Sequence, residues 1–144
     1  MIDRRIKLNI QKSIDRVSKE NLNTTIILLA CCFIDGLGKK TFYGGPEYRF
    51  KRYIKDFMPE TYRELKVRSL KLKRPDDFCL QVLWRDVRCG LVHEIDPKSK
   101  SIILGRTGKS IVHQNTNDKR YLGKDLVLSS PMFFDNFLLS LNKL

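Results

Sequence analysis

The run of apolar residues from position 26 to position 34 constrains the fold more than any other feature of the chain. It lies within residues 25–37, which are apolar on nearly every side when drawn as an α-helix, and this pattern is typical of a buried central helix. The run is shorter than the roughly 18 residues that a transmembrane helix needs. We therefore predict a central buried helix, capped by Asn23 or Thr24, in a protein without a membrane span.

The length and composition of the chain fit one folded domain. It has 144 residues, of which 42% are hydrophobic, a share that is typical of globular proteins and too high for a disordered chain. A domain of this size buries roughly 68–70% of the surface that its unfolded chain exposes, so its core needs no disulfide bonds or bound metal for stability. We predict a single domain that spans residues 1–144.

Apolar residues recur at three- and four-residue steps on both sides of the central run, which is the pattern of amphipathic helices. A proline at the start of a helix and acidic residues in its first turn mark where two of these helices begin. We therefore predict a mainly α fold, a bundle of about five helices. The expected helices cover residues 6–17, 25–37, 47–57, about 75–91 and 132–143, with a looser basic segment at 61–72.

The pattern changes between the last two of these helices. Residues 101–104 and 110–113 are short runs rich in β-branched residues, and the loop between them contains two glycines. This arrangement is typical of a β-hairpin, and residues 126–128 favour a further short strand. We predict a small β-hairpin at about residues 100–114, just before the C-terminal helix.

The chain is strongly basic, with a net charge of +12 from 28 lysines and arginines and 16 aspartates and glutamates. This excess favours a polyanionic partner, because clustered cations release counterions when they bind phosphates. Residues 47–74 hold ten of the basic side chains and four acidic ones, with aromatic residues interleaved. Arg49, Lys51, Arg52 and Lys55 are therefore candidate nucleic-acid-binding residues. An anionic membrane surface, or a solvated helical face that binds nothing, is compatible with the same charges.

The four cysteines are Cys31, Cys32, Cys79 and Cys89, and none belongs to a C-x-x-C pair, which argues against a zinc site. The first residues of the chain lack the apolar core of a signal peptide. Dispersed cysteines without an export signal are typical of a reducing compartment. We therefore expect a cytoplasmic protein with reduced thiols, no metal and no cofactor.

Histidine is scarce, and one of only two histidines, His93, ends an arginine-rich segment at residues 84–93. The segment also carries Arg85, Asp86 and Arg88. An imidazole moves protons near neutral pH, and a permanently charged guanidinium stabilises a phosphorane. This set suits RNA cleavage by the 2′-hydroxyl without a metal. The alternative is a histidine that caps the end of a helix, with the arginines reaching solvent.

Helix geometry complicates this prediction. At about 100° per residue, Asp86 lies within about 20° of the face of His93, whereas Arg88 lies about 140° from it. A long side chain or a distortion near Gly90 is therefore needed to bring Arg88 to His93. Asp35 lies within the apolar segment 25–37, which favours a buried carboxylate paired with an arginine over a catalytic one.

At these residues the chain resembles the HEPN superfamily. The stretch from Arg88 to His93 matches the R-x4-6-H motif at its shortest spacing, late in a helical domain. Residues 27–39 and 49–57 are similar to segments of bacterial HEPN-like proteins, and the resemblance covers most of residues 22–144. It implies a HEPN-like helical bundle that forms a homodimer, with both Arg–His pairs in one shared cleft.

Active HEPN proteins are metal-independent endoribonucleases of toxin–antitoxin and other defence systems. The resemblance thus implies RNA as substrate, an antitoxin as a further partner, and Arg88 and His93 as the catalytic pair. We add Asp86 and Arg85 as supporting candidates, because Cys89 stands where many active members have a polar residue. Other HEPN domains only bind, so a non-catalytic module that binds nucleic acid or a protein is the alternative. A helix-turn-helix DNA-binding protein has less support, since no compact turn joins two short helices.

Overall fold

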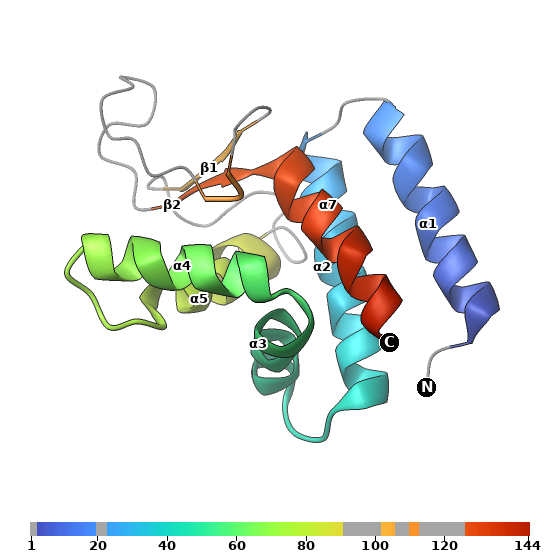
Figure 1. The fold of residues 1–144 in the computed structure, drawn as a ribbon, viewed down its shortest axis with the longest axis horizontal. Coiled ribbons are helices and arrows are strands. Elements are labelled where there is room, and N and C mark those ends of the chain that lie inside the picture. The colour runs from blue at the N-terminus through green and yellow to red at the C-terminus, as the bar shows by residue number, and fades with distance from the viewer. Residues whose placement is uncertain (1–2, 20–22, 91–101, 106–109, 113–125) are drawn as a thin grey trace.

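The computed structural model describes residues 3–19, 23–90, 102–105, 110–112 and 126–144, and this part of the chain is mainly helical, as predicted (Figure 1). Its helices are α1 (Arg4–Lys19), α2 (Asn23–Thr41), α3 (Pro46–Phe57), α4 (Pro59–Lys71), α5 (Phe78–Val82), the π-helix η1 (Leu83–Arg88), α7 (Ser130–Ser140) and the 3-10 helix η3 (Leu141–Lys143). The described strands are β1 (Ile102–Gly105) and β2 (Leu126–Ser129).

The central helix that the sequence predicts is α2. Its residues Ile27, Ala30 and Ile34 are fully buried, and α1, α3 and α7 all pack against it. Figure 1 shows α7 crossing in front of α2, with α1 on the outer side. The helix continues to Thr41, past the predicted end, and Lys39 and Lys40 in its last turn complement the helix dipole. Within the described ranges, no helix combines the length and the apolarity needed to cross a membrane.

The outer helix α1 contacts α2 through the start of its predicted apolar stripe. Ile10 is buried, and Ile6 is partly buried against the core. The other predicted stripe positions, Ile14 and Val17, have side chains outside the described part of the structure. The amphipathic pattern thus accounts for how α1 docks, at least over its first two turns.

The segment predicted as loose at residues 61–72 is instead a regular helix, α4. It follows α3 after a single residue, the fully buried Met58, whose φ of −124° and ψ of 61° turn the chain. The buried face of α4 includes Thr61, Leu65 and Ser69, spaced four residues apart. Because two of these three residues are polar, hydrophobic periodicity does not reveal the helix.

The predicted β-hairpin is wrong in its pairing. β1 pairs in parallel with β2, from Ile102 with Leu126 to Gly105 with Ser129. On the other edge of β2, Val112 pairs with Leu128 in an antiparallel bridge. The two segments expected to pair with each other therefore lie on either side of β2, in the residues that the structure describes. The physical reason is that every residue of β2 is buried, which suits a strand with partners on both edges.

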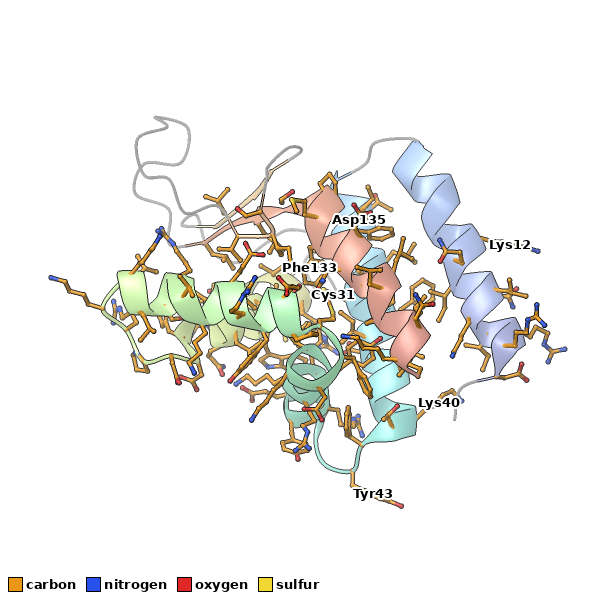
Figure 2. All side chains as sticks on the ribbon, viewed as in Figure 1. Lys12, Cys31, Lys40, Tyr43, Phe133 and Asp135 are labelled. Atoms are coloured by element: carbon orange, nitrogen blue, oxygen red, sulfur yellow. The ribbon has the colours of Figure 1, made fainter. Side chains whose placement is uncertain are left out.

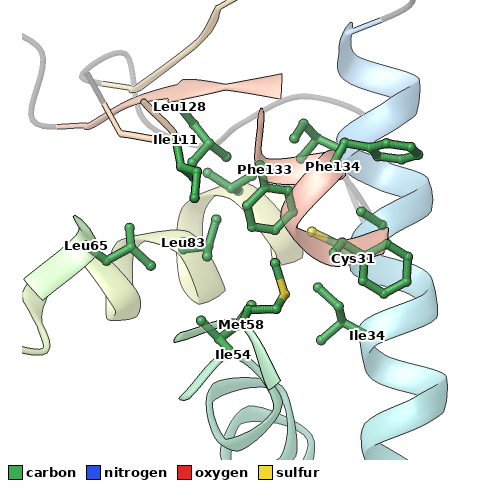
Figure 3. Close-up of a cluster of buried hydrophobic side chains, with 14 of the residues drawn as sticks. Cys31, Ile34, Ile54, Met58, Leu65, Leu83, Ile111, Leu128, Phe133 and Phe134 are labelled. Carbon is green, nitrogen blue, oxygen red and sulfur yellow. The ribbon is translucent and has the colours of Figure 1, made fainter. Parts of the chain in front are cut away.

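The core gathers side chains from segments far apart in the sequence. Figure 3 shows Cys31 of α2, Met58 between α3 and α4, Leu83 of η1, Leu128 of β2 and Phe133 of α7 in one cluster. Figure 2 shows the contrast with the surface, where Lys12 of α1 and Tyr43, which follows α2, point away from the body of the protein. This cluster fixes η1 against α2 and α3, which is what positions the candidate site.

Buried hydrogen bonds tie α7 to α3 and α4. The hydroxyls of Tyr53 and Ser140 lie 2.6 Å apart, and burial raises the pKa of Tyr53 to about 12, which the bond to Ser140 opposes. Asn136 Oδ1 accepts hydrogen bonds from the hydroxyl of Thr61, at 2.7 Å, and from its backbone N–H, at 3.4 Å. That N–H lies in the first turn of α4, where no side chain of the helix caps it, so Asn136 acts as a remote cap.

Substituting Asn136→Ala should destabilise the fold by about 1–3 kcal/mol, because it leaves two buried donors of Thr61 without an acceptor. Urea unfolding of the variant and of the wild type measures the difference. Asn142→Ala is the matched control, since Asn142 is exposed, and it should change stability by less than about 0.5 kcal/mol. Equal midpoints for the two variants would contradict the capping role.

Candidate functional site

The segment that carries the candidate catalytic residues contains a wide helical turn. α5 passes into η1, a π-helix, and the backbone N–H of Cys89 bonds to the carbonyl of Trp84, five residues earlier. Of the two alternatives that the sequence leaves open, a long side chain or a distortion near Gly90, a helical distortion is present, at residues 83–88. Single π-turns are rare in helices and are frequent at functional sites.

Arg88, the last residue of η1, forms an ion pair with Asp35 of α2. The Nε and Nη2 atoms of Arg88 lie 2.7 and 2.6 Å from Asp35 Oδ2, and both side chains are largely but not fully buried. The expected pairing of Asp35 with an arginine is thus confirmed. The Arg88 guanidinium also lies over the ring of Trp84, 4.4 Å from its centroid, and Trp84 packs on the buried Phe50 at 5.4 Å. Together these contacts fix the orientation of the guanidinium.

Arg88 and Asp35 line a pocket of about 270 Å³ between α2, α3 and η1. Three cationic side chains border it, together with the one carboxylate. Its lining residues are Asp35, Gly36, Lys39, Pro46, Arg49 and Arg88. A concave site with converging charges is a natural place for a small anionic ligand.

The ionisation of Asp35 depends on its cationic neighbours. Burial raises the pKa of the Asp35 carboxyl above its ordinary value, and the hydrogen bond and charge of Arg88, with the charge of Arg49, oppose this rise. Removing Arg88 would leave the carboxylate desolvated without its principal partner. The pair therefore adds little net stability, but removal of either partner leaves the other charge desolvated and unpaired, which is costly.

Arg85 and Asp86, the supporting candidates, pair with each other and not with Arg88. The Nε and Nη2 atoms of Arg85 lie 2.9 and 3.0 Å from the two carboxylate oxygens of Asp86. Asp86 is buried and Arg85 is largely exposed, and neither lines the pocket beside Arg88. The carboxylate partner of Arg88 thus comes from α2 and not from its own helix.

His93 lies outside the residues that the structure describes, so its distance to Arg88 stays a prediction. Cys89, which follows Arg88, has its Sγ 3.5 Å from Arg88 Nη1. All four cysteines are free thiols, as expected, and burial is the main cause of a raised pKa at both Cys31 and Cys32. In the described part of the chain, no three histidine, cysteine or acidic side chains are grouped as metal ligands would be.

The candidate nucleic-acid-binding residues divide between two sides of α3. Arg49 faces the pocket of Arg88, whereas Lys51, Arg52 and Lys55 line a second hollow of about 190 Å³. Tyr48, Tyr62 and Leu80 complete that hollow.

Two of the three cations in the second hollow are already paired with acidic neighbours on α3. Lys51 Nζ lies 2.8 Å from Glu47 and also donates to Gln81, and Arg52 Nε lies 2.6 Å from Asp56. The α3 surface is therefore less positive than its count of basic residues suggests.

Sequence reasoning did not single out Lys39 and Trp84, which both belong to the site. Lys39 lies four residues after Asp35, so the two share one face of α2. That spacing is a signal that would have found it once Asp35 was singled out. Trp84 precedes Arg88 by four residues, and side chains four residues apart are neighbours on a helix, so the aromatic could have been expected beside the arginine.

Comparison of the chain with protein-family models, with curated proteins and with solved structures finds no significant match.

A double-mutant cycle should show that Asp35 and Arg88 depend on each other. We expect a coupling energy of about 1–3 kcal/mol between Asp35→Asn and Arg88→Gln, because each substitution leaves a partly desolvated charge without its partner. Urea unfolding of the four proteins measures it. The exposed pair of Glu60 and Arg63, 2.5 Å apart, is the matched control, with an expected coupling of at most about 0.5 kcal/mol. Equal couplings for the two pairs would refute the interdependence.

Proposed function

We propose that this chain is a metal-independent endoribonuclease of HEPN type, which cleaves RNA by attack of a 2′-hydroxyl on the adjacent phosphate. The observation that carries the proposal is the state of Arg88: Asp35 and Trp84 fix its guanidinium at the wall of an open cationic pocket. A charged donor that is held in place before the substrate binds needs no reorganisation during the reaction. The R-x4-H spacing then puts a histidine five residues further along.

In the proposed reaction, His93 acts as general base or general acid and Arg88 binds the scissile phosphate. A base removes the proton of the 2′-hydroxyl, the 2′-oxygen forms a bond to phosphorus, and the bond to the 5′-oxygen breaks. The leaving 5′-oxygen takes a proton from the acid. The products carry a 2′,3′-cyclic phosphate and a 5′-hydroxyl. Arg85, held by Asp86 and largely exposed, supplements the positive charge near the RNA.

The proposal extends to assembly. A HEPN-like bundle pairs its motif helices across a homodimer, so that two Arg–His pairs share one cleft. The proposed biological setting is a toxin or another defence ribonuclease, with an antitoxin protein as partner. What supports these points is the resemblance of residues 27–39, 49–57 and 88–93, together with the net charge of +12.

A second candidate is a non-catalytic module of the same type that binds nucleic acid or a protein. A specific observation favours it, since Asp35 and Cys89 already occupy N–H groups of Arg88, and an arginine used in this way can be structural. Such a module would bind RNA in a salt-dependent way without cutting it. Neutralising Arg49, Lys51, Arg52 and Lys55 together would abolish that binding.

Purified protein with EDTA should cleave unstructured RNA, and His93→Ala should reduce the rate by about a hundredfold or more, because the proton transfers lose their catalyst. Gel analysis of end-labelled RNA measures the rate, and the chemistry of the new ends identifies the cyclic phosphate. His113→Ala is the matched control, since this is the other histidine of the chain, and it should retain the wild-type rate.

The outcomes separate the two candidates. Equal residual activity of wild type and His93→Ala would rule out the ribonuclease. RNA binding without cleavage, unaffected by His93→Ala, would establish the non-catalytic module. Sedimentation that gives a monomer at micromolar concentration would contradict the shared cleft.

A further inference from the structure

The charges around the pocket of Arg88 do not balance. Lys39, Arg49 and Arg88 border it, and Asp35 is the only acidic residue of its lining. Like charges around a small cavity repel one another, so an arrangement of this kind is stabilised by an anion between them. The lining has a net charge of two positive, which matches the charge of roughly −1.5 to −2 that a phosphate monoester carries at neutral pH.

Arg49 has a donor that the described part of the protein does not use. Its Nε atom is buried and has no hydrogen-bond partner among the described residues. A buried donor without an acceptor costs stability, and a ligand that supplies an oxygen removes that cost. The backbone of Arg49 lies close to α2, because a Cβ at Gly38 would lie only 3.2 Å from the Arg49 carbonyl oxygen. The close approach of α2 and α3 at Gly38 thus keeps Arg49 beside the pocket.

Arg88 also has N–H donors that its described contacts do not use. A guanidinium has five N–H groups, and the described contacts of Arg88 use three of them, two on Asp35 and one on Cys89 Sγ. The two that remain are on the two Nη atoms, from which they can donate to two oxygens of one phosphate. Asp35 is therefore a positioning residue, since it holds one edge of the guanidinium and leaves the other for a ligand.

The start of α3 adds to the positive potential. Pro46, the first residue of α3, lines the pocket, and no side chain caps this end of the helix. A Cβ at Gly45 would meet nothing within 4 Å, so the approach to the first turn is open. The positive end of the helix dipole and its free N–H groups favour an anion there.

We propose that this pocket is a binding site for one phosphate group, held by Arg49, Lys39 and Arg88. A volume of about 270 Å³ leaves room for a phosphate and several waters but not for duplex RNA, so the phosphate must come from a flexible or terminal part of the ligand. This phosphate site rests on the proposed function, because Arg88 belongs both to the site and to the proposed catalytic pair. Phosphate binding needs neither His93 nor cleavage, so the two proposals can fail separately.

The first test titrates inorganic phosphate into the protein at constant ionic strength, with chloride as the reference anion. NMR should show shifts of the backbone amides of Glu47, Tyr48 and Arg49 that saturate with phosphate and not with chloride. Lys39→Gln should weaken binding about three- to tenfold, because the lysine loses a charge-assisted contact. Lys40→Gln is the matched control: it removes the same charge from the next residue, which does not line this pocket, and it should leave the affinity unchanged.

Substitutions of Arg49 should have a larger effect on phosphate binding than Lys39→Gln. Arg49→Gln should weaken phosphate binding at least about tenfold, and Arg49→Lys should restore part of the affinity, because it keeps the charge and loses the Nε donor. The melting temperature without phosphate shows whether each variant is folded, and Lys39→Gln, at an exposed position, keeps the test decisive if Arg49→Gln is not.

The binding experiments with RNA use the His93→Ala variant, so that the RNA is not cleaved during the measurement. If a 5′-phosphorylated single strand binds more tightly than its 5′-hydroxyl form, and Lys39→Gln removes the difference, the site takes a terminal phosphate. If Lys39→Gln weakens both RNAs equally, it takes a phosphate of the backbone. If Lys39→Gln and Lys40→Gln behave alike toward phosphate and toward both RNAs, the site does not exist. Saturable phosphate binding without RNA cleavage by the wild type leaves the site standing and rejects the ribonuclease.

Discussion

The ion pair between Asp35 and Arg88 joins α2 to η1, and the rest of the candidate site depends on this contact. α1, α3 and α7 pack against α2, and Asp35 is its only acidic residue. Burial of that carboxylate is costly, and the cost falls only if a cation reaches it from another element. Arg88 does so from η1, 53 positions along the chain, and the contact fixes how η1 lies against α2. The pocket exists because these two helices and α3 converge on this pair.

The same pair decides what the site can do. An arginine in solvent is mobile and must be ordered when a phosphate binds, whereas Arg88 is ordered in advance by Asp35 on one edge and Trp84 on one face. Trp84 in turn packs on Phe50, so the orientation of the guanidinium is set by the hydrophobic core. If the proposed phosphate site is correct, stability and ligand binding are coupled through the Arg88 side chain, whose structural role is compatible with a functional one.

Much of this arrangement follows from the sequence, and the rest depends on tertiary contacts that a one-dimensional pattern does not carry. Apolar spacing predicts α2, α3 and α7, and the carboxylate in an apolar segment predicts that Asp35 pairs with an arginine, though not which one. The apolar pattern does not predict α4, because the buried face of this helix includes the polar residues Thr61 and Ser69. Their hydroxyls form hydrogen bonds with Asn136 of α7 and with Cys79 at the start of α5. The pairing of β1 with β2 is also missed, since both edges of a strand look alike in sequence. Nor does the motif reveal that Asp86 turns to Arg85 and leaves Arg88 to α2.

The π-turn at residues 83–88 has a consequence for how this helix relates to its neighbours. A π-turn holds one residue more than an α-turn, so it rotates everything after it by about 100° relative to everything before it. The residues of α5 follow one register, set by the core contact of Val82, and Cys89 and Gly90, the described residues after η1, follow another. In the described part of the chain, α5 and the two residues after η1 therefore face different directions because of one extra residue in the turn. Loss of a single residue there would keep every apolar side chain of α5 in place and still turn Arg88 away from Asp35.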